Sequence, residues 1–583
     1  RQLWSGWSAT PDTASETLER VAANPDVGTM AALLLSRYCQ FAMAGGDGAE
    51  PGSGEKMAVR LLLAATEFQQ QPLVQNFASV LMETGEAITS LLHETVSGTL
   101  EMDDLDAITA RLKATSSPRI DAQTLSAAAG TSGDDHAVDT RQLLRLIELS
   151  KDLSAAHERL VHGKHGLGRA RYGLAIAGGR TTAWAGAFPH NPFQAPVLID
   201  MSGDAAQLAA GLIEGHLQET TELARLLRLA RLEIEQPDGA EWQREEILGL
   251  HWQDLSDEEY ALCPPLVLIG SEEMLAGSGL GQLTWLLNSR LPVKVLVLQS
   301  LDFGVASSGM HESAQAPINN PRASLGLLAL AQRNAYVAQT SVADPAHLGD
   351  SLLEALRYDG PALIQAYAPS PAQHGFPSEQ SIQQAELAVS SRALPLFRYN
   401  PSAEGVFGSR ISLAGNPQCA EFLAVGDDGD RPLTPADWAL GQQRFQHAFV
   451  PLAADAATPV PLHEWLQLTI SERSRKTPCV TRGSDADEQR FTMSKALLDT
   501  VATCLDTWRT LQELSGIVTP FTERVEEEIR AAVAAEHRAE LDAQKSAAKD
   551  EINALREKTE AEIASKIRSR LLALASRKRG GKE

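Results

Sequence analysis

The sequence predicts an α/β protein built around a parallel sheet, with helices on both faces of that sheet. The main observation is that short, continuously apolar strand patterns alternate with helical patterns between residues 141 and 405. Strands that are apolar throughout are typical of parallel sheets, because both faces of such a sheet are buried. Two further observations predict an all-α N-terminal domain over residues 1–113 and one long, charged helix over residues 522–583.

The N-terminal 113 residues are rich in Ala and Leu at helical spacing, as in Thr29–Ala44 and Glu55–Phe68. A Gly-rich segment, Gly45–Lys56, interrupts these patterns and is a flexible loop by composition. Residues 114–140 contain Ser-Ser-Pro-Arg and Gly-Thr-Ser-Gly-Asp-Asp, which indicate a linker.

Six strands are expected in the central domain. Each is bounded by a helical pattern or by a turn, as in repeated strand–helix–strand units. Their ranges are Tyr172–Gly178, Ala195–Met201, Pro265–Gly270, Val293–Ser300, Tyr336–Val342 and Ala362–Ala368. Residues 406–521 are expected to be a loop-rich and helical extension, because Pro and Gly punctuate much of that region.

The segment from Thr522 to Ala575 contains neither Gly nor Pro and is predicted to be one helix. Glutamates near its start and basic residues at its end match the charge order that the helix dipole favours. At ~1.5 Å per residue the helix would be about 80 Å long. Its apolar stripe is thin, so we expect an intermolecular or interdomain helix. The alternative is a partly disordered charged tail.

Composition limits the classes of partner. A net charge of −24 disfavours nucleic acid, and no apolar run approaches the ~18 residues of a membrane span. A cytoplasmic protein of several domains is therefore expected. The chain begins at Arg1 without an initiator Met or a signal peptide, so a processed or C-terminal piece of a longer protein is expected.

Polar residues follow two neighbouring predicted strands, in Gly270–Glu273 and in Gln299–Gly304. In thiamine-diphosphate enzymes, a Gly-Asp-Gly turn ends one strand, and an Asn or Thr follows the next. These side chains hold the Mg²⁺ that bridges the diphosphate, and oxygen ligands suit that metal. The spacing of the two segments in this chain matches that arrangement.

Residues Gly173–Pro401 resemble the thiamine-diphosphate domain of pyruvate:ferredoxin oxidoreductases. Three further stretches carry the resemblance: Leu174–Phe193, Asp359–Ser370 and Ala393–Pro401. The resemblance implies a thiamine-diphosphate-type fold and a 2-oxoacid substrate. It also implies thiamine diphosphate and Mg²⁺ as cofactors, and partner subunits or a homodimer.

The implied cofactor-binding positions are Gly270, Glu272, Ser300 and Asp302, and they depart from the family pattern. Glu272 stands where the family has Asp, and Glu273 replaces a Gly. Ser300 can substitute for the family's Thr, whereas Asp302 adds a carboxylate. If Mg²⁺ is retained, its ligands would be Glu272, Ser300 and Asp302. Extra carboxylates weaken diphosphate binding unless a metal offsets their charge.

The resemblance also implies four cysteines around an iron–sulfur cluster. Two of these positions carry Arg180 and Ser370, and the pair expected before Gly173 has no counterpart. Without thiolates, no [4Fe–4S] cluster is expected. The chain has five cysteines, none in a Cys-x-x-Cys pair, and reduced, mostly buried thiols are expected.

Two other segments can be interpreted as sites. Ala44–Gly48 contains a Gly-Asp-Gly, with Asn76 at a workable spacing, but no buried strand precedes Asn76, so a flexible loop is favoured. The segment His162–Arg171 could bind an anion, and the alternative is a solvated basic loop. Its candidate residues are Lys164, His165, Arg169 and Arg171.

Other catalytic motifs are missing from the sequence. It contains no P-loop, no His-Glu-x-x-His and no Gly-x-Ser-x-Gly. His251, His311 and His374 are isolated in the sequence, and lone histidines more often serve structure than catalysis.

Three functional hypotheses follow. The leading one is a divergent, structural module of a pyruvate:ferredoxin oxidoreductase-like enzyme, with a degraded cofactor site and no iron–sulfur cluster. The second is an active thiamine-diphosphate and Mg²⁺-dependent enzyme that decarboxylates a 2-oxoacid together with partner subunits. The third is an assembly protein that recruits partners through Thr522–Ala575.

Overall fold

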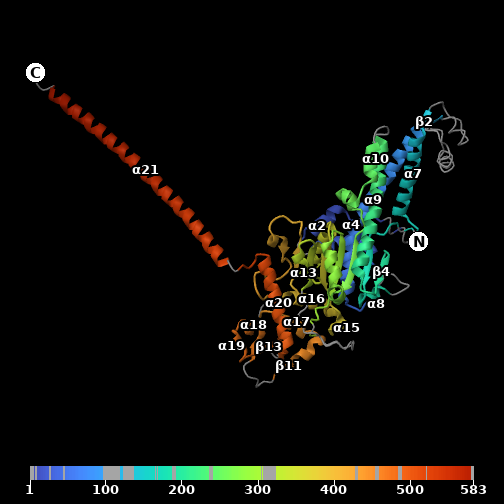
Figure 1. Cartoon of the computed structure of the whole chain (residues 1–583). Helices are drawn as coiled ribbons and strands as arrows, with labels where there is room; N and C mark the ends of the chain where they lie inside the picture. The colour runs from blue at the N-terminus through green and yellow to red at the C-terminus, as the bar shows by residue number, and fades with distance from the viewer. Residues whose placement is uncertain are drawn as a thin grey trace. The chain divides into compact units, whose positions relative to one another are not determined.

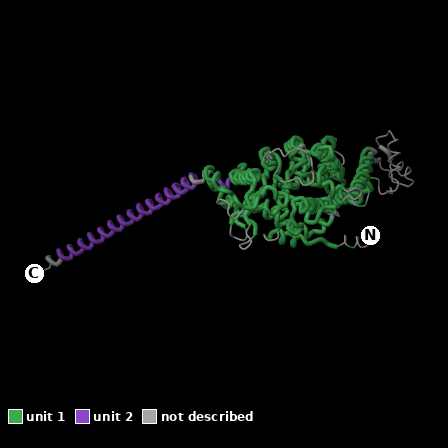
Figure 2. The backbone as a smooth tube through the Cα atoms, turned by 90° about the horizontal axis from the view of Figure 1, so that it is seen from below, with its two compact units in different colours: residues 1–515 green, residues 516–583 purple. Residues whose placement is uncertain are grey.

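The computed structural model of the 583-residue chain describes residues 6, 10–24, 28–43, 46, 48–95, 119–121, 137–164, 166, 168–186, 192–235, 241–303, 305, 324–426, 431–452, 459–483, 489–519 and 522–579. The chain forms two compact units, residues 1–515 and residues 516–583, coloured separately in Figure 2.

The first unit is built around an eight-stranded sheet of order β10-β9-β7-β8-β6-β5-β3-β4. Neighbours among β3 to β8 pair in parallel, and β9 and β10 add two antiparallel pairings at one end. The predicted parallel sheet is confirmed, and all six predicted strands form. The bounds are β3 Gly173–Ala177, β4 Val197–Asp200, β5 Leu266–Ser271, β6 Val293–Gln299, β7 Tyr336–Ser341, β8 Ala362–Tyr367, β9 Phe397–Tyr399 and β10 Ile411–Ser412.

Successive side chains of the central strands enter two different hydrophobic cores. In β5, Val267 and Ile269 belong to one core, whereas Leu266 and Leu268 belong to the other. All four side chains are fully buried. Side chains alternate between the two faces of a strand, so a strand buried on both faces must be apolar throughout.

Helices supply the other side of each core (Figure 1). One core contains residues of α4, α14, α16 and α17, and the second contains residues of α9, α12 and α13; α20 contributes to both. The bounds are α4 Gly54–Thr95, α9 Ala205–Glu235, α12 Leu280–Asn288, α13 Leu325–Gln332, α14 Pro345–Arg357, α16 Ser381–Ser390, α17 Pro435–Leu440 and α20 Lys495–Leu514.

Helix α4 joins the core of the sheet to a third core made mainly of helices. Leu62 near its start packs in the sheet core, whereas Leu81 and Ile88 pack with α7 (Thr140–Val161) and α9. The N-terminal region also forms α2 (Ser15–Ala22) and α3 (Gly28–Leu35). The helices predicted there therefore exist, but α4 shares the core of the sheet. The domain boundary near residue 113 stays a prediction.

The structure adds short strands where the sequence suggested loops. Within residues 114–140, β1 (Arg119–Asp121) pairs antiparallel with β2 (Ala137–Asp139). Within residues 406–521, four strands form a second sheet in the order β11-β14-β13-β12. These strands have only three to six residues, too few to give a clear alternating pattern. Their bounds are β11 Phe449–Pro451, β12 Pro459–Pro461, β13 Thr477–Arg482 and β14 Gln489–Met493.

The second unit contains α21, one helix of 58 residues from Thr522 to Arg579 (Figure 1). This confirms the predicted long C-terminal helix. The side chains from Arg524 to Ala575 are all exposed. Within the described ranges, neither α21 nor any other helix has the length and apolar character needed to cross a membrane.

Candidate functional site

The predicted site residues lie after the carboxyl ends of neighbouring parallel strands. Arg180 follows β3, Glu272 follows β5, Ser300 follows β6 and Ser370 follows β8. Strand β4 lies on one side of β3, and β5 and β6 follow on the other side. The order of the strands therefore reverses between β3 and β5. Open α/β sheets bind ligands at such a switch point. The fold therefore brings these residues to the edge where a ligand would be expected.

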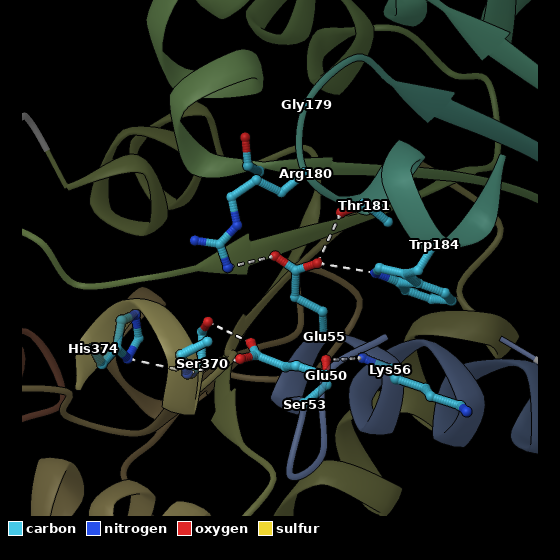
Figure 3. Close-up of polar contacts among 12 residues, drawn as sticks. Glu50, Ser53, Glu55, Lys56, Gly179, Arg180, Thr181, Trp184, Ser370 and His374 are labelled. Carbon is cyan, nitrogen blue, oxygen red and sulfur yellow. Dashed lines mark hydrogen bonds and ion pairs between the residues drawn. The ribbon is translucent and has the colours of Figure 1, made fainter. Parts of the chain in front are cut away.

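The start of α4 adds two carboxylates to this edge, Glu50 and Glu55 (Figure 3). Residues Gly45–Lys56 are predicted to be a flexible loop, but α4 already begins at Gly54. Gly54 permits the close approach, because a Cβ at this position would lie 2.3 Å from Cδ of Pro369. The Gly54 N–H donates to the Pro369 carbonyl at 2.8 Å. The loop therefore holds the first turn of α4 against the segment that follows β8.

Glu55 accepts hydrogen bonds from three residues that follow β3 (Figure 3). Arg180 Nη2 lies 3.2 Å from Oε1, and Trp184 Nε1 and Thr181 Oγ1 lie 3.2 and 3.4 Å from Oε2. The Glu55 side chain is 11% exposed and that of Arg180 is 38% exposed. A carboxylate this buried requires such donors. Arg180, at an expected cysteine position, thus forms an ion pair.

Ser370 stands at the other expected cysteine position and contacts Glu50, which precedes α4. The Ser370 hydroxyl donates to Oε1 of Glu50, and the Ala372 N–H donates to Oε2 at 2.8 Å. The Ser370 N–H lies 3.3 Å from Nδ1 of His374, which accepts the hydrogen bond. His374 was isolated in the sequence, but the fold buries it at this edge.

Burial and two arginines, Arg180 and Arg444, set the protonation states at this edge. Burial lowers the pKa of His374 well below its usual value, and the charges of Arg444 and Arg180 lower this pKa further. Burial also lowers the pKa of Arg444 to about 10, although Tyr367 and Asp302 oppose this shift. At neutral pH, His374 is therefore neutral and Arg444 is charged.

The loop after β6 has an unusual backbone. Leu301 and Phe303 have φ values of 52° and 54°, in the left-handed region, which costs roughly 1–2 kcal/mol for each non-Gly residue. The Phe303 ring packs against Trp438 at 5.6 Å and Phe445 at 6.4 Å between ring centroids. Arg444 lies over both of these rings. The aromatic cluster offsets the strain, and such strain concentrates at functional sites.

The loop after β5 forms a π-helical turn, Glu273–Ser278, preceded by Glu272. Met274 in this turn packs on the glycines that follow β3. A Cβ at Gly179 would lie 3.5 Å from Cγ of Met274, and a Cβ at Gly178 would lie 3.7 Å from its Cε. An apolar side chain therefore lies at the switch point of the sheet.

Binding of Mg²⁺ by Glu272, Ser300 and Asp302 stays a prediction. Among the residues it describes, no three His, Cys, Asp or Glu side chains are grouped so that they could hold a metal ion. Asp302 instead interacts electrostatically with Arg444. All five cysteines are free thiols, and four of them are buried, as expected.

The predicted anion-binding residues do not share one environment. Lys164 is exposed, and His165 lies outside the described residues. Arg169 donates to the Leu262 carbonyl at 2.8 Å, and Arg171 donates to Oε1 of Gln71 at 3.2 Å. The two arginines thus bind groups of the protein itself, and anion binding here stays a prediction.

The remaining candidates lie elsewhere. Asn76 is exposed within α4, and Asp47 of the Gly-Asp-Gly lies outside the described residues. His251 is exposed, and His311 is also outside the described residues.

Sequence reasoning missed Glu50, Glu55 and Arg444. The available signal was Gly-Ser-Gly-Glu at residues 52–55, which places a carboxylate in the first turn of a helix just after two glycines. Arg444 Nη2 donates a hydrogen bond to the Leu301 carbonyl at 3.3 Å. The two residues are 143 positions apart, so no local sequence pattern links Arg444 to this edge.

Comparisons with known proteins identify distant relatives. No family model matches the chain. Pyruvate:ferredoxin oxidoreductase of Moorella thermoacetica is 33% identical over 154 residues, which cover 25% of this chain and 13% of that protein. Pyruvate-flavodoxin oxidoreductase of Rhodospirillum rubrum is 27% identical over 229 residues, which cover 36% of this chain and 18% of that protein. Over the matched residues, this chain is similar to pyruvate:ferredoxin and pyruvate-flavodoxin oxidoreductases.

One further relative and one solved structure were also matched. Ketoisovalerate oxidoreductase subunit VorB of Pyrococcus horikoshii is 39% identical over 72 residues, covering 12% of this chain and 23% of that subunit. A solved 2-oxoglutarate:ferredoxin oxidoreductase from Magnetococcus marinus covers 36% of this chain and 58% of that chain, at 12% identity and a TM-score of 0.23. That structural similarity is too low to add to the sequence relationship. The matches to the first two relatives span less than a fifth of their length.

Proposed function

We propose that this chain is a structural module of a 2-oxoacid oxidoreductase-like assembly, with a degraded thiamine-diphosphate site. The observation that carries the proposal is the pair of contacts at the expected cysteine positions. Arg180 forms an ion pair with Glu55, and Ser370 donates a hydrogen bond to Glu50. Guanidinium and hydroxyl groups cannot replace the thiolates that hold an iron–sulfur cluster.

The neighbouring loops support the same proposal. A diphosphate needs backbone N–H groups, cations or a metal around it. At the switch point, Met274 packs on the glycines after β3 instead. Glu272 and Glu273 add negative charge beside it, and like charges repel a diphosphate. The residues present fit a Mg²⁺–diphosphate group poorly, so we assign no reaction step to one.

The retained sheet supports a role in an assembly. The parallel sheet and the switch point are intact, and one relative is named as a subunit of an oxidoreductase. A domain that keeps this sheet can still present the same surfaces to other chains after the residues of its site have changed. The proposed partners are protein subunits of such an assembly or a second copy of this chain.

Calorimetric titration of the chain with thiamine diphosphate and Mg²⁺ tests the proposal. We expect no binding heat at cofactor concentrations up to the millimolar range. Micromolar binding would overturn the degraded-site proposal.

The variant Glu272→Gln gives the matched control for that titration. If wild-type chain binds the cofactor and this variant does not, Glu272 is a working metal ligand and the site is not degraded. Wild-type chain and variant are expected to give the same flat titration.

A further inference from the structure

Helix α21 exposes a row of large apolar side chains. Leu541, Ile552, Ile563 and Leu574 are 46%, 60%, 52% and 60% exposed. Most side chains of comparable size in the first unit are buried in its cores. A helix with an uncovered apolar row gains stability when a second surface covers that row.

These four residues are spaced by eleven positions. Eleven residues of a helix make about 3.06 turns at ~3.6 residues per turn, so the four side chains lie almost above one another. Ile567 follows Ile563 by four positions and widens the row on the same side. An eleven-residue apolar repeat is typical of helices that wind around each other in a slight right-handed supercoil. The row is therefore a seam suited to another helix.

Residues 536–579, the C-terminal three quarters of α21, carry different charges in their two halves. Residues 536–557 contain six Asp and Glu against four Lys and Arg, whereas residues 558–579 contain two Glu against seven Lys and Arg. One half is therefore acidic and the other strongly basic. A partner helix that fits must carry the opposite order of charge along the same length.

We propose that α21 pairs with α21 of a second copy of this chain, in antiparallel orientation. The antiparallel arrangement places the acidic half of each helix beside the basic half of the other, whereas a parallel pair would bring the two basic halves together. The partner with the required charge order is thus the same helix reversed.

The spacing also fixes a register for this pair. With the twofold axis between Glu557 and Lys558, Leu541 lies opposite Leu574 of the other copy, and Ile552 lies opposite Ile563. In the same register the small Ala548 faces the larger Ile567, so a layer of unequal side chains lies between the Leu541 layer and the two central isoleucine layers. This pairing is independent of the state of the site in the first unit.

Light scattering on a sizing column tests the pairing in the full chain. We expect a dimer, and we expect the double variant Ile552→Glu/Ile563→Glu to be a monomer. The matched control is Ala554→Glu/Ala561→Glu, which adds the same charges on the opposite side of the helix and should stay dimeric. A monomeric wild-type chain, or a dimer that survives the first double variant, would overturn the proposal.

Cysteine cross-linking tests the orientation. Oxidation of an equal mixture of Ile552→Cys and Ile563→Cys chains should give a disulfide between the two variants. Oxidation of either variant alone should give none, because eleven residues, about 16 Å of helix, separate its cysteine from the copy in the partner. Efficient cross-linking of Ile552→Cys to itself would instead show a parallel pair and refute the antiparallel orientation.

Discussion

At the scale of single residues, the edge of the sheet is defined by pairs of side chains that come from distant parts of the sequence. Arg180 is held by Glu55, and Ser370 by Glu50. In each pair, one residue stands where the resemblance implies a cysteine, and the other is a glutamate in or just before the first turn of α4. Replacing Arg180 or Ser370 with cysteine would remove one of the hydrogen bonds that its carboxylate accepts, so the members of a pair depend on each other.

Glu55 is expected to contribute to stability more than an exposed glutamate. Replacing Glu55 with Ala removes the acceptor of Trp184, Thr181 and Arg180, and we expect a loss of about 2 kcal/mol in the free energy of unfolding. The partly exposed ion pair with Arg180 supplies only a small share of this. Urea denaturation measures the change, with Glu245→Ala on an exposed helix face as the control. Equal stability of both variants would contradict the predicted role.

His347 is expected to make stability depend on pH. Burial and the charge of Arg398 lower the pKa of His347 to about 3. The folded chain therefore keeps this histidine neutral, whereas the unfolded chain binds a proton below its usual pKa of ~6.5. Stability is present above that pH and falls as the pH decreases from about 6.5 toward 3, by up to ~1.4 kcal/mol per pH unit for this proton.

The variant His347→Gln isolates this contribution. Urea denaturation at pH 6.5 and pH 4.5 should show a smaller loss of stability for the variant than for the wild-type chain. The same loss in both proteins would mean that His347 does not remain neutral in the folded state.

At the scale of elements, one helix connects the site with the rest of the fold. Helix α4 begins at the carboxyl edge of the sheet, crosses the sheet core and ends in the helical core with α7 and α9. Its position at the edge depends on how closely its first turn approaches the loop after β8. Gly54 therefore determines where the carboxylate of Glu55 is placed.

Glycine substitutions in two helices should have opposite effects. A Cβ on Gly54 would lie 2.3 Å from Pro369 and 2.8 Å from the Ala368 carbonyl carbon, whereas Gly211 in α9 has nothing within 4 Å of the same position. We expect Gly54→Ala to cost about 1–3 kcal/mol through overpacking. Gly211→Ala should stabilise the chain by about 0.5–1 kcal/mol, because Ala favours the helix.

Thermal or urea unfolding of the two variants measures both changes. If Gly54→Ala is as stable as the wild-type chain, the helix start can move away from the loop after β8. In that case the placement of Glu55 does not depend on this glycine.

At the scale of the whole molecule, the chain consists of two units with different sources of stability. The unit of residues 1–515 has extensive buried cores. In the unit of residues 516–583, the side chains of α21 from Arg524 to Ala575 are exposed. A single helix gains little stability from its own backbone, so α21 depends on what covers its apolar row.

A truncated chain that ends at Thr519 lacks α21. We expect the free energy of unfolding of the first unit to change by less than about 0.5 kcal/mol, because the apolar side chains of α21 are all exposed. The nine Trp residues all precede Gly516, so Trp fluorescence follows the first unit alone during urea denaturation. A loss of stability above about 1 kcal/mol would show that α21 supports the first unit.

The sequence by itself determined the features that depend on local pattern. Continuous apolar runs required strands buried on both faces, and the six strands formed where they were expected. The absence of Gly and Pro, together with the order of charges, likewise determined α21. The quoted motifs also placed Arg180, Glu272, Ser300 and Ser370 after the carboxyl ends of strands.

Only the tertiary structure decided what surrounds those residues. The contacts of Glu55 with Arg180, of Glu50 with Ser370, and of Arg444 with the loop after β6 join positions 125, 320 and 143 residues apart. No spacing or periodicity encodes such contacts, because they depend on how helices and loops pack on the sheet. The packing of Met274 on Gly179 and the start of α4 at Gly54 are decided in the same way, by the close fit of side chains in space.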